Sequence, residues 1–272
     1  MEFQVGGKTV FAATGGRAFE AGRPTIIFLH GAGADHTVWA LQTRYFAHRG
    51  NNVLAVDLPG HGRSQGAALA TIDEMADWVA LGMDALDVDR AAIAGHSMGS
   101  LVALASTIRH PGRVRALALL ATSLPMAVSD ELLSAARSGD HAAYDMITIW
   151  GHSRTGRIGG NTAPGLWMAG DGVRLLERSG PGVLYRDLEA CRTYRAPDED
   201  LARIACETLV INAARDIMTP MAGARAVAAK IQGARVITLA ECGHMMMAEQ
   251  PDRVLDGLAE ICGGTQMLGL IL

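Results

Sequence analysis

The sequence predicts an α/β fold: a mostly parallel β-sheet with helices on both faces. Short, continuous apolar runs recur along the chain, and segments with helical apolar spacing separate them. Continuous apolar runs suit strands that are buried on both faces of a parallel sheet, and their alternation with helices is typical of a doubly wound sheet. With 272 residues, 49% of them hydrophobic, the chain can form one large domain of this kind, or such a domain with an insertion.

The first part of the chain supplies the early strands. Residues 9–13 predict a strand that runs antiparallel to the rest, and residues 25–29, 52–56 and 90–94 predict buried parallel strands. Between the last two, apolar residues over 72–86 recur with a period close to 3.6, which predicts an amphipathic helix. The three buried runs are followed by His30, Asp57 and Ser97, so we expect these side chains at one edge of the sheet.

The pattern changes after a further strand predicted at 114–121. Residues 123–197 contain no obvious buried strand, and they mix helical pieces with a Gly-rich stretch over 151–182. We interpret this segment as an inserted, mainly helical cap, with the core formed by residues 1–122 and 198–272. The helical pieces of the cap are predicted at 131–136, 141–150 and 184–191. The core pattern then resumes with strands at 207–212 and 235–239, a helix over 221–231 between them and a last helix that begins near Pro251.

Ser97 lies within Gly95-x-Ser97-x-Gly99, between a predicted strand and a predicted helix. A strand that turns at once into a helix needs residues without side chains beside the turn, and the two glycines meet that need. Ser97 would then sit on a strained corner above the positive end of a helix, as a nucleophile requires. The motif is short, and the alternative is a Gly-rich turn with a solvated serine.

An acid and a histidine follow the two late strands. Asp216 comes after the run at 207–212, and His244 comes after the run at 235–239. The chain order Ser97, Asp216, His244 is that of nucleophile-elbow enzymes, in which the imidazole takes the serine proton and the carboxylate orients the imidazole. As alternatives, Asp216 would cap the following helix, and His244 would be a helix-start or core histidine.

Acyl transfer also needs amide donors for the developing oxyanion. The backbone N–H of Met98, directly after the nucleophile, and that of Ala32, between two glycines, are the candidates.

These motifs together resemble the serine branch of the α/β-hydrolase superfamily, over about residues 25–121 and 208–261. The resemblance implies the α/β-hydrolase fold, with an eight-stranded mostly parallel sheet, a lid between the sixth and seventh strands, and no metal or organic cofactor. Serine at position 97 disfavours the haloalkane dehalogenase and epoxide hydrolase branches, which use a carboxylate nucleophile. The motifs that carry the resemblance are His30-Gly31-Ala32-Gly33, Asp57-Leu58-Pro59-Gly60-His61-Gly62-Arg63-Ser64, Gly95-His96-Ser97-Met98-Gly99, Asp216 and Gly243-His244.

We therefore expect a serine hydrolase that cleaves carboxylic esters of small or medium size through an acyl-enzyme. Lactonase, C–C bond hydrolase, thioesterase and cofactor-free perhydrolase activities remain open on the same triad. A ligand-sensing receptor is the alternative from another class, because residues 30–39 are similar to those of the strigolactone and karrikin receptor group. The expected substrate-pocket residues are His30, Gly31, Trp150, Trp167 and Met245, although the two tryptophans would equally suit the core of the cap.

Composition limits the partners. The net charge of −4 and the lack of a basic run argue against nucleic acid, and no apolar run reaches the ~20 residues that span a bilayer. We see no signal peptide at the N-terminus, and the four cysteines, without metal-like spacing, suit reduced buried thiols. We expect a cytoplasmic protein that binds a small acyl substrate and no metal, and that forms a homodimer, if any, through the cap or the apolar tail at 267–272.

Overall fold

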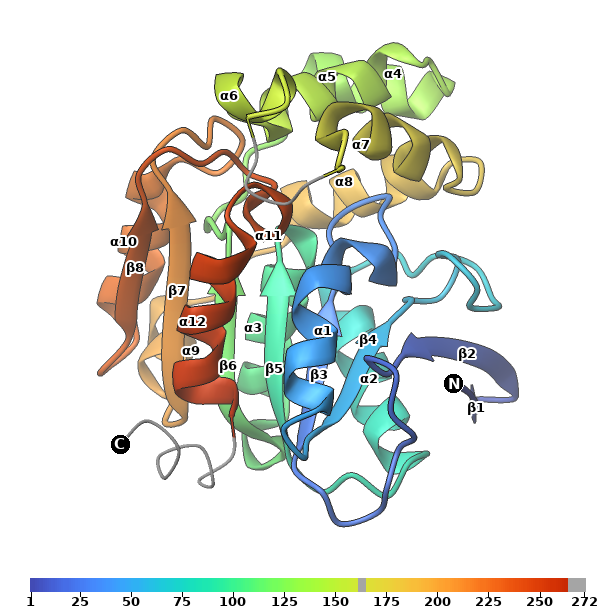
Figure 1. Ribbon diagram of the computed structural model, residues 1–272, viewed down its shortest axis with the longest axis vertical. Helices are drawn as coiled ribbons and strands as arrows, with labels where there is room; N and C mark the ends of the chain where they lie inside the picture. Colours follow the sequence, from blue (N-terminus) through green and yellow to red (C-terminus); the bar gives the residue numbers. More distant parts are fainter. Residues whose placement is uncertain (161–164, 264–272) are drawn as a thin grey trace.

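The computed structural model describes residues 1–160 and 165–263, which contain one eight-stranded sheet (Figure 1). The strands are β1 (Glu2–Val5), β2 (Lys8–Ala13), β3 (Thr25–Leu29), β4 (Asn52–Val56), β5 (Ala91–His96), β6 (Val114–Leu120), β7 (Glu207–Ala213) and β8 (Arg235–Leu239). Their order is β1-β2-β4-β3-β5-β6-β7-β8, with β1 and β2 antiparallel to their neighbours and the other five pairs parallel. The predicted mostly parallel sheet is confirmed, and β1 is a short strand that the apolar pattern did not indicate.

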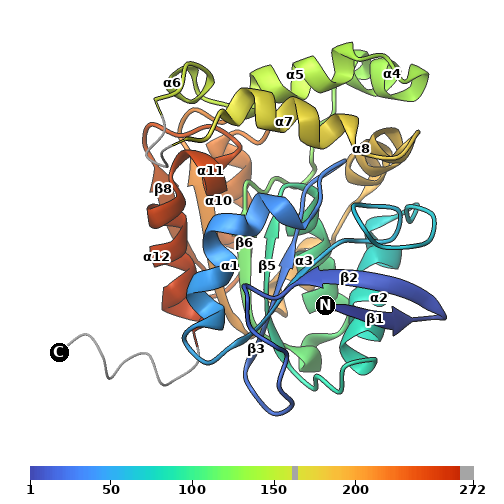
Figure 2. The ribbon, with the colours of Figure 1, turned by 45° about the vertical axis from the view of Figure 1, so that its right-hand side comes forward.

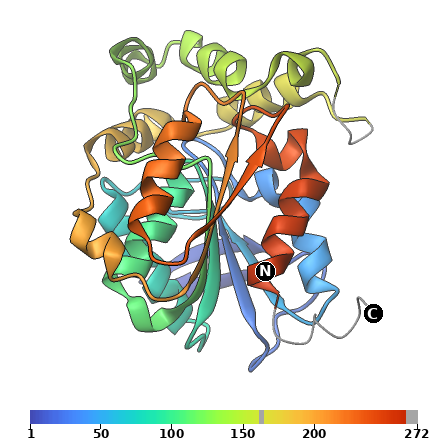
Figure 3. The same ribbon diagram turned by 90° about the vertical axis from the view of Figure 1, so that its left-hand side faces the viewer.

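Helices cover both faces of the sheet (Figure 3). On one face, α2 (Ile72–Asp84), α3 (Met98–Arg109) and α10 (Met221–Lys230) pack on one apolar cluster, and on the other, α1 (Ala40–Ala47) and α12 (Pro251–Cys262) pack on a second. Successive side chains of a strand point to opposite faces. This is why all five residues of β3 are buried: Ile27 and Leu29 join the first cluster, and Ile26 and Phe28 the second.

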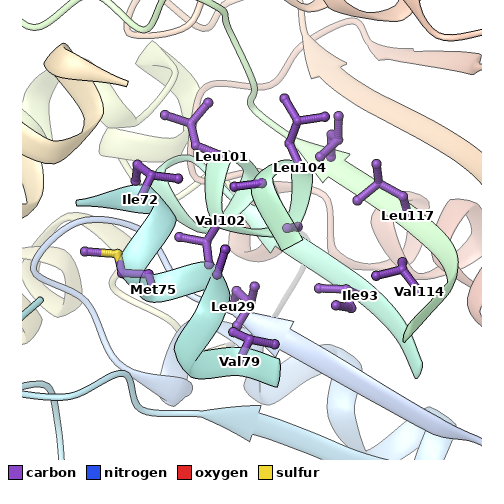
Figure 4. Close-up of a cluster of buried hydrophobic side chains, with 14 of the residues drawn as sticks. Leu29, Ile72, Met75, Val79, Ile93, Leu101, Val102, Leu104, Val114 and Leu117 are labelled. Carbon is purple, nitrogen blue, oxygen red and sulfur yellow. The ribbon is translucent and has the colours of Figure 1, made fainter. Parts of the chain in front are cut away.

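Close packing in the first cluster fixes α3 against the sheet. Figure 4 shows Leu101 and Val102 of α3 in one buried cluster with Val79 of α2 and with Leu29 and Ile93 of the central strands. The nucleophile candidate precedes α3 directly, so this packing also holds its backbone. The remaining core elements are the short helices η1 (His36–Trp39), η2 (Pro111–Arg113), α9 (Asp198–Ala202) and α11 (Met246–Glu249).

Between β6 and β7, five of the six described helices lie above the C-terminal ends of the strands (Figures 1 and 2). They are α4 (Asp130–Ser138), α5 (Ala142–Gly151), α6 (Arg154–Arg157), α7 (Met168–Glu177) and α8 (Val183–Thr193). Leucines such as Leu132, Leu176 and Leu188 give them a small apolar core of their own. The sequence did not predict α7, because Gly170 and Gly172 lower the intrinsic helix preference, and packing of Leu176 against its neighbours overrides that preference.

No helix in the described ranges is long and apolar enough to cross a membrane. The apolar tail at 267–272 lies outside the described residues, so the homodimer stays a prediction.

Candidate active site

Ser97 occupies a strained turn between β5 and α3. Its backbone has φ 53° and ψ −119°, a region that costs a non-glycine residue about 1–3 kcal/mol. A Cβ on Gly95 would overlap the carbonyl of Gly99, and a Cβ on Gly99 would overlap the carbonyl of Leu29. Both glycines are therefore required for the turn, and the half-buried Ser97 side chain faces a cavity.

The loop after β3 lies against this turn. A Cβ on Gly31 would be 3.3 Å from Ser97 Cβ, so the loop approaches the serine as closely as a glycine permits. Neither the amide of Ala32 in this loop nor that of Met98 at the start of α3 donates a hydrogen bond to an acceptor among the described residues. Two N–H groups close to Ser97 thus remain available for a ligand.

His244 and Asp216 form a buried pair in the loops after β8 and β7. His244 Nδ1 lies 2.8 Å from Asp216 Oδ2. The Asp216 carboxylate also accepts hydrogen bonds from the amides of Met218 and Thr219 at 2.8 and 2.9 Å, and from Thr219 Oγ1 at 2.6 Å.

Electrostatics keep Asp216 ionised. Burial alone would raise the pKa of its carboxyl group, but the His244 charge and the hydrogen bonds from His244 and Thr219 lower it below its usual value. An ionised carboxylate only accepts hydrogen bonds. Nδ1 of His244 therefore carries the proton, and in the neutral imidazole Nε2 is left with a free lone pair.

A cavity of about 410 Å³ between the core and the cap helices brings these groups together. Ser97, His244 and Ala32 all line it, as do three of the predicted pocket residues, Gly31, Trp150 and Met245. Most of its other lining side chains are aliphatic or methionine, and among the described residues it has no Arg, Lys, Asp or Glu in its wall. The cavity therefore favours a neutral, largely apolar ligand.

Two predicted pocket residues lie elsewhere, which corrects the expectation for them. His30 is fully buried beneath the loop, where its Nε2 accepts the Leu58 amide at 3.2 Å and its Nδ1 lies 2.9 Å from the Gly31 carbonyl. Trp167 is 70% exposed at the start of α7. Its ring covers Gly170 on the outer side of the cap, because a Cβ on Gly170 would overlap it.

His96, next to the nucleophile candidate, supports His244. Its Nε2 donates a hydrogen bond to the main-chain carbonyl of His244 at 2.9 Å, and the two rings lie 4.8 Å apart. Burial, together with the nearby His244, lowers the pKa of His96 to about 3, so this imidazole is neutral. The sequence motif around Ser97 does not by itself indicate this contact.

Two carboxylates that the sequence analysis missed tie the cap to the site. Asp187 of α8 accepts hydrogen bonds at 2.8 Å from the Gly33 amide and from His61 Nε2. Glu249 of α11 accepts from the amides of Gly243 and Ser153, at 3.1 Å and 3.2 Å. Acidic residues on amphipathic segments are usually solvated, so no pattern in the sequence marked these two as buried.

Other reactive groups are committed to structural contacts. Burial raises the pKa of the Cys242 thiol, which donates a weak hydrogen bond to the Gly243 carbonyl at 3.5 Å. Ligand atoms of Asp35, His36 and Asp57 lie within 4.8 Å of one another. Asp57 accepts the His36 amide and His36 Nδ1, both at 2.8 Å, and the Arg63 amide at 2.9 Å, so it organises its own loop.

Comparison with known proteins identifies the family. The model of the Alpha/beta hydrolase family matches residues 26–256, and the chain belongs to this family. The chain is 29% identical over 246 residues to the dihydrolipoyllysine-residue acetyltransferase component of the acetoin cleaving system of Pseudomonas putida, covering 86% of this chain and 62% of the relative. It thus spans about three fifths of that relative's length.

Two further similarities cover more of the related protein. The pimeloyl-[acyl-carrier protein] methyl ester esterase of Aromatoleum aromaticum is 28% identical over 247 residues, which are 85% of this chain and 94% of the esterase. Among solved structures, the enol-lactonase from Burkholderia xenovorans LB400 superposes with a TM-score of 0.83 at 24% identity, over 96% of this chain and 99% of that one. The structural match establishes the fold.

Proposed function

We propose that the protein is a serine hydrolase that cleaves neutral carboxylic esters of small or medium size. The observation that carries this proposal is that Ser97, on its strained turn, lines one cavity with His244, whose ring is paired with the buried Asp216. The pimeloyl-[acyl-carrier protein] methyl ester esterase among its relatives supports the choice of ester hydrolysis.

In the proposed mechanism, Ser97 Oγ attacks the ester carbonyl while His244 Nε2 takes the serine proton. The amides of Ala32 and Met98 donate hydrogen bonds to the oxyanion. When the C–O bond breaks, His244 returns the proton to the departing alcohol and the acyl group remains on Ser97. Water then attacks this acyl-enzyme with His244 again as the base, which releases the acid and free Ser97. Asp216 holds the imidazole tautomer and stabilises the imidazolium.

The shape and lining of the cavity bound the substrate. We propose residues 123–197 as the lid of a core formed by residues 1–122 and 198–272, and Trp150 as part of the acyl pocket. Since the described wall contains no lysine or arginine, it offers no permanent positive charge to neutralise a substrate carboxylate. This favours plain esters and neutral lactones over a carboxylate such as the 2-hydroxy-6-oxo-2,4-heptadienoate that another relative hydrolyses.

An active-site fluorophosphonate probe tests the nucleophile. The parent protein should be labelled, and Ser97→Ala should not. Ser129→Ala is the matched control: Ser129 also lines the cavity, but its Oγ accepts the Leu132 amide at 3.2 Å, so labelling should persist. Labelling of Ser97→Ala at the parent level would overturn the assignment. A panel of p-nitrophenyl esters, lactones and vinylogous diketones then identifies the reaction.

A further inference from the structure

Two polar side chains of the cap line the cavity. Thr148 of α5 and His152, one turn later, are 6% and 5% exposed and both line the cavity wall. Thr148 Oγ1 has no hydrogen-bond partner among the described residues. A buried hydroxyl without a partner is unfavourable unless a ligand completes it.

His152 offers the complementary group. Its Nδ1 lies 2.8 Å from the Thr148 carbonyl, which can only accept, so Nδ1 carries the proton. Burial, helped by the nearby His244 and Arg157, lowers the pKa of His152 more than the hydrogen bond to the Thr148 carbonyl and the charge of Glu249 raise it, so the ring is neutral. In a neutral ring protonated at Nδ1, Nε2 is an acceptor. No donor for it is found in the part of the chain that the structure describes.

Gly172 of α7 keeps the space beside these two groups open. A Cβ at this position would lie 3.4 Å from His152 Cε1 and 3.6 Å from Thr148 Oγ1. A single methyl group would thus touch both side chains without overlapping either.

We propose that Thr148 and His152 form a subsite for a hydroxyl group, and that the substrate is a neutral ester that carries a hydroxyl group on its acyl or its alcohol part. This inference rests on the proposed ester hydrolysis. A hydroxyl group satisfies both partners at once, since it accepts from Thr148 Oγ1 and donates to His152 Nε2. A carbonyl group would leave His152 unpaired, a carboxylate would face the Nε2 lone pair, and an alkyl group would satisfy neither.

Matched pairs of substrates test the subsite. One series compares methyl esters of ω-hydroxyalkanoic acids with methyl alkanoates of the same chain length. The other compares monoacetates of α,ω-diols with alkyl acetates, because the hydroxyl group can lie on either side of the ester. In one of the series, kcat/KM should be about tenfold higher for the hydroxylated member at the best chain length, as expected for one well-placed pair of buried hydrogen bonds.

Substitutions then assign the preference to the subsite. Thr148→Val keeps the branched shape but removes the hydroxyl group, so the ratio of kcat/KM values should fall towards one. Thr148→Ser keeps the hydroxyl group and should retain the ratio. Gly172→Ala should also lower the ratio of kcat/KM values, because the added methyl group fills the space beside Thr148 and His152. The same substitution should raise the melting temperature, because alanine favours a helix more than glycine does.

Gly82→Ala in α2 is the control for Gly172→Ala. A Cβ there meets no atom within 4 Å, so this variant should gain stability and leave the ratio unchanged. No hydroxyl preference in either series, or an undiminished preference in Thr148→Val, would overturn the subsite. Failure of the proposed function is distinct: then no ester of either series would be hydrolysed and the probe would not label Ser97.

Discussion

Two buried histidine–aspartate pairs with the same nitrogen–oxygen distance have different surroundings in this molecule. In both, a ring nitrogen lies 2.8 Å from the Asp Oδ2 atom, and in both the side chains are at most 4% exposed. His244 pairs with Asp216 at the cavity, within the sheet's own loops. His61 pairs with Asp187 of the cap helix α8, which also holds the Gly33 amide.

The two pairs differ at the ring nitrogen that does not contact the aspartate. His61 donates from Nδ1 to the Pro59 carbonyl at 3.0 Å and from Nε2 to Asp187, so neither nitrogen is free. Burial alone would lower the pKa of His61, but the Asp187 charge and hydrogen bond raise it. The result is a buried ion pair that fastens the cap to the loop of Ala32. His244 uses only Nδ1 for its aspartate, and it lines the cavity. In the proposed mechanism its free Nε2 accepts the serine proton, which the doubly hydrogen-bonded ring of His61 could not do.

Replacing the two histidines should separate these roles most strongly. His244→Gln should lower kcat by about 10⁶-fold, as expected for loss of the base of a triad, with little change in melting temperature. His61→Gln should lower the free energy of unfolding by about 3–5 kcal/mol, because it leaves Asp187 buried without a counter-charge, and should lower kcat far less. Ester turnover and urea unfolding of both variants provide the measurements. Equal losses of kcat in two folded variants would refute the division of roles.

The aspartates extend the same comparison. Asp216→Asn should lower kcat by about 10⁴-fold, because an amide no longer enforces the Nδ1–H tautomer of His244. Asp187→Asn still accepts the Gly33 amide but removes the counter-charge of His61, so it should chiefly lower stability. Steady-state kinetics at saturating ester, with circular dichroism to check folding, distinguish the two. The comparison fails if Asp187→Asn has the larger effect on kcat.

Local patterns were sufficient to predict the core of the fold. The runs at 25–29 and 52–56 coincide with β3 and β4, which are buried along their whole length and are therefore mostly apolar. The run at 235–239 coincides with β8, an edge strand in which only Leu239 is buried. The helix over α7 was not predicted, since its stability comes from packing within the cap rather than from the propensities of its own residues.

The site was predictable only where it depends on chain order. Ser97, Asp216 and His244 each follow a strand of one parallel sheet, and this places them at the same edge. Asp187 and Glu249 depend on how separate segments dock, which no local spacing encodes. For the same reason the sequence did not distinguish Trp150, which lines the cavity, from Trp167, which faces solvent.

The histidines should also respond to pH in opposite directions. Burial, with the nearby His61, lowers the pKa of His30 to about 4, and that of His96 is about 3, against 6.5 in the unfolded chain. Between the folded and unfolded pKa values, the unfolded state binds more protons than the folded state. The free energy of unfolding should therefore fall as the pH falls from 6.5 to 4, by about 3 kcal/mol for each histidine.

The pKa of His61 is raised in the folded protein. Its contribution to the free energy of unfolding is therefore complete below pH 6.5, and it is lost as the pH rises through the pKa of His61 in the folded state. Urea unfolding from pH 4 to 9 measures both trends. His96→Gln should flatten the acid side, and His61→Gln the alkaline side. A parent protein of constant stability between pH 6.5 and pH 4 would contradict the assignment of neutral His30 and His96.

The smallest expected effect concerns the side chain that anchors the proposed catalytic pair. Thr219 Oγ1 donates a hydrogen bond to Asp216 Oδ2 at 2.6 Å and lies 3.3 Å from His244 Nδ1. In the other pair, the second ring nitrogen of His61 bonds to the backbone carbonyl of Pro59, which no substitution removes. Thr219→Val should lower kcat about tenfold with little change in KM, as expected for one hydrogen bond to a charged group, because the carboxylate is less well oriented. Thr219→Ser should recover the activity. A rise in KM without a fall in kcat would show instead that Thr219 only shapes the cavity wall, and the triad would then be anchored by the backbone amides of Met218 and Thr219 alone.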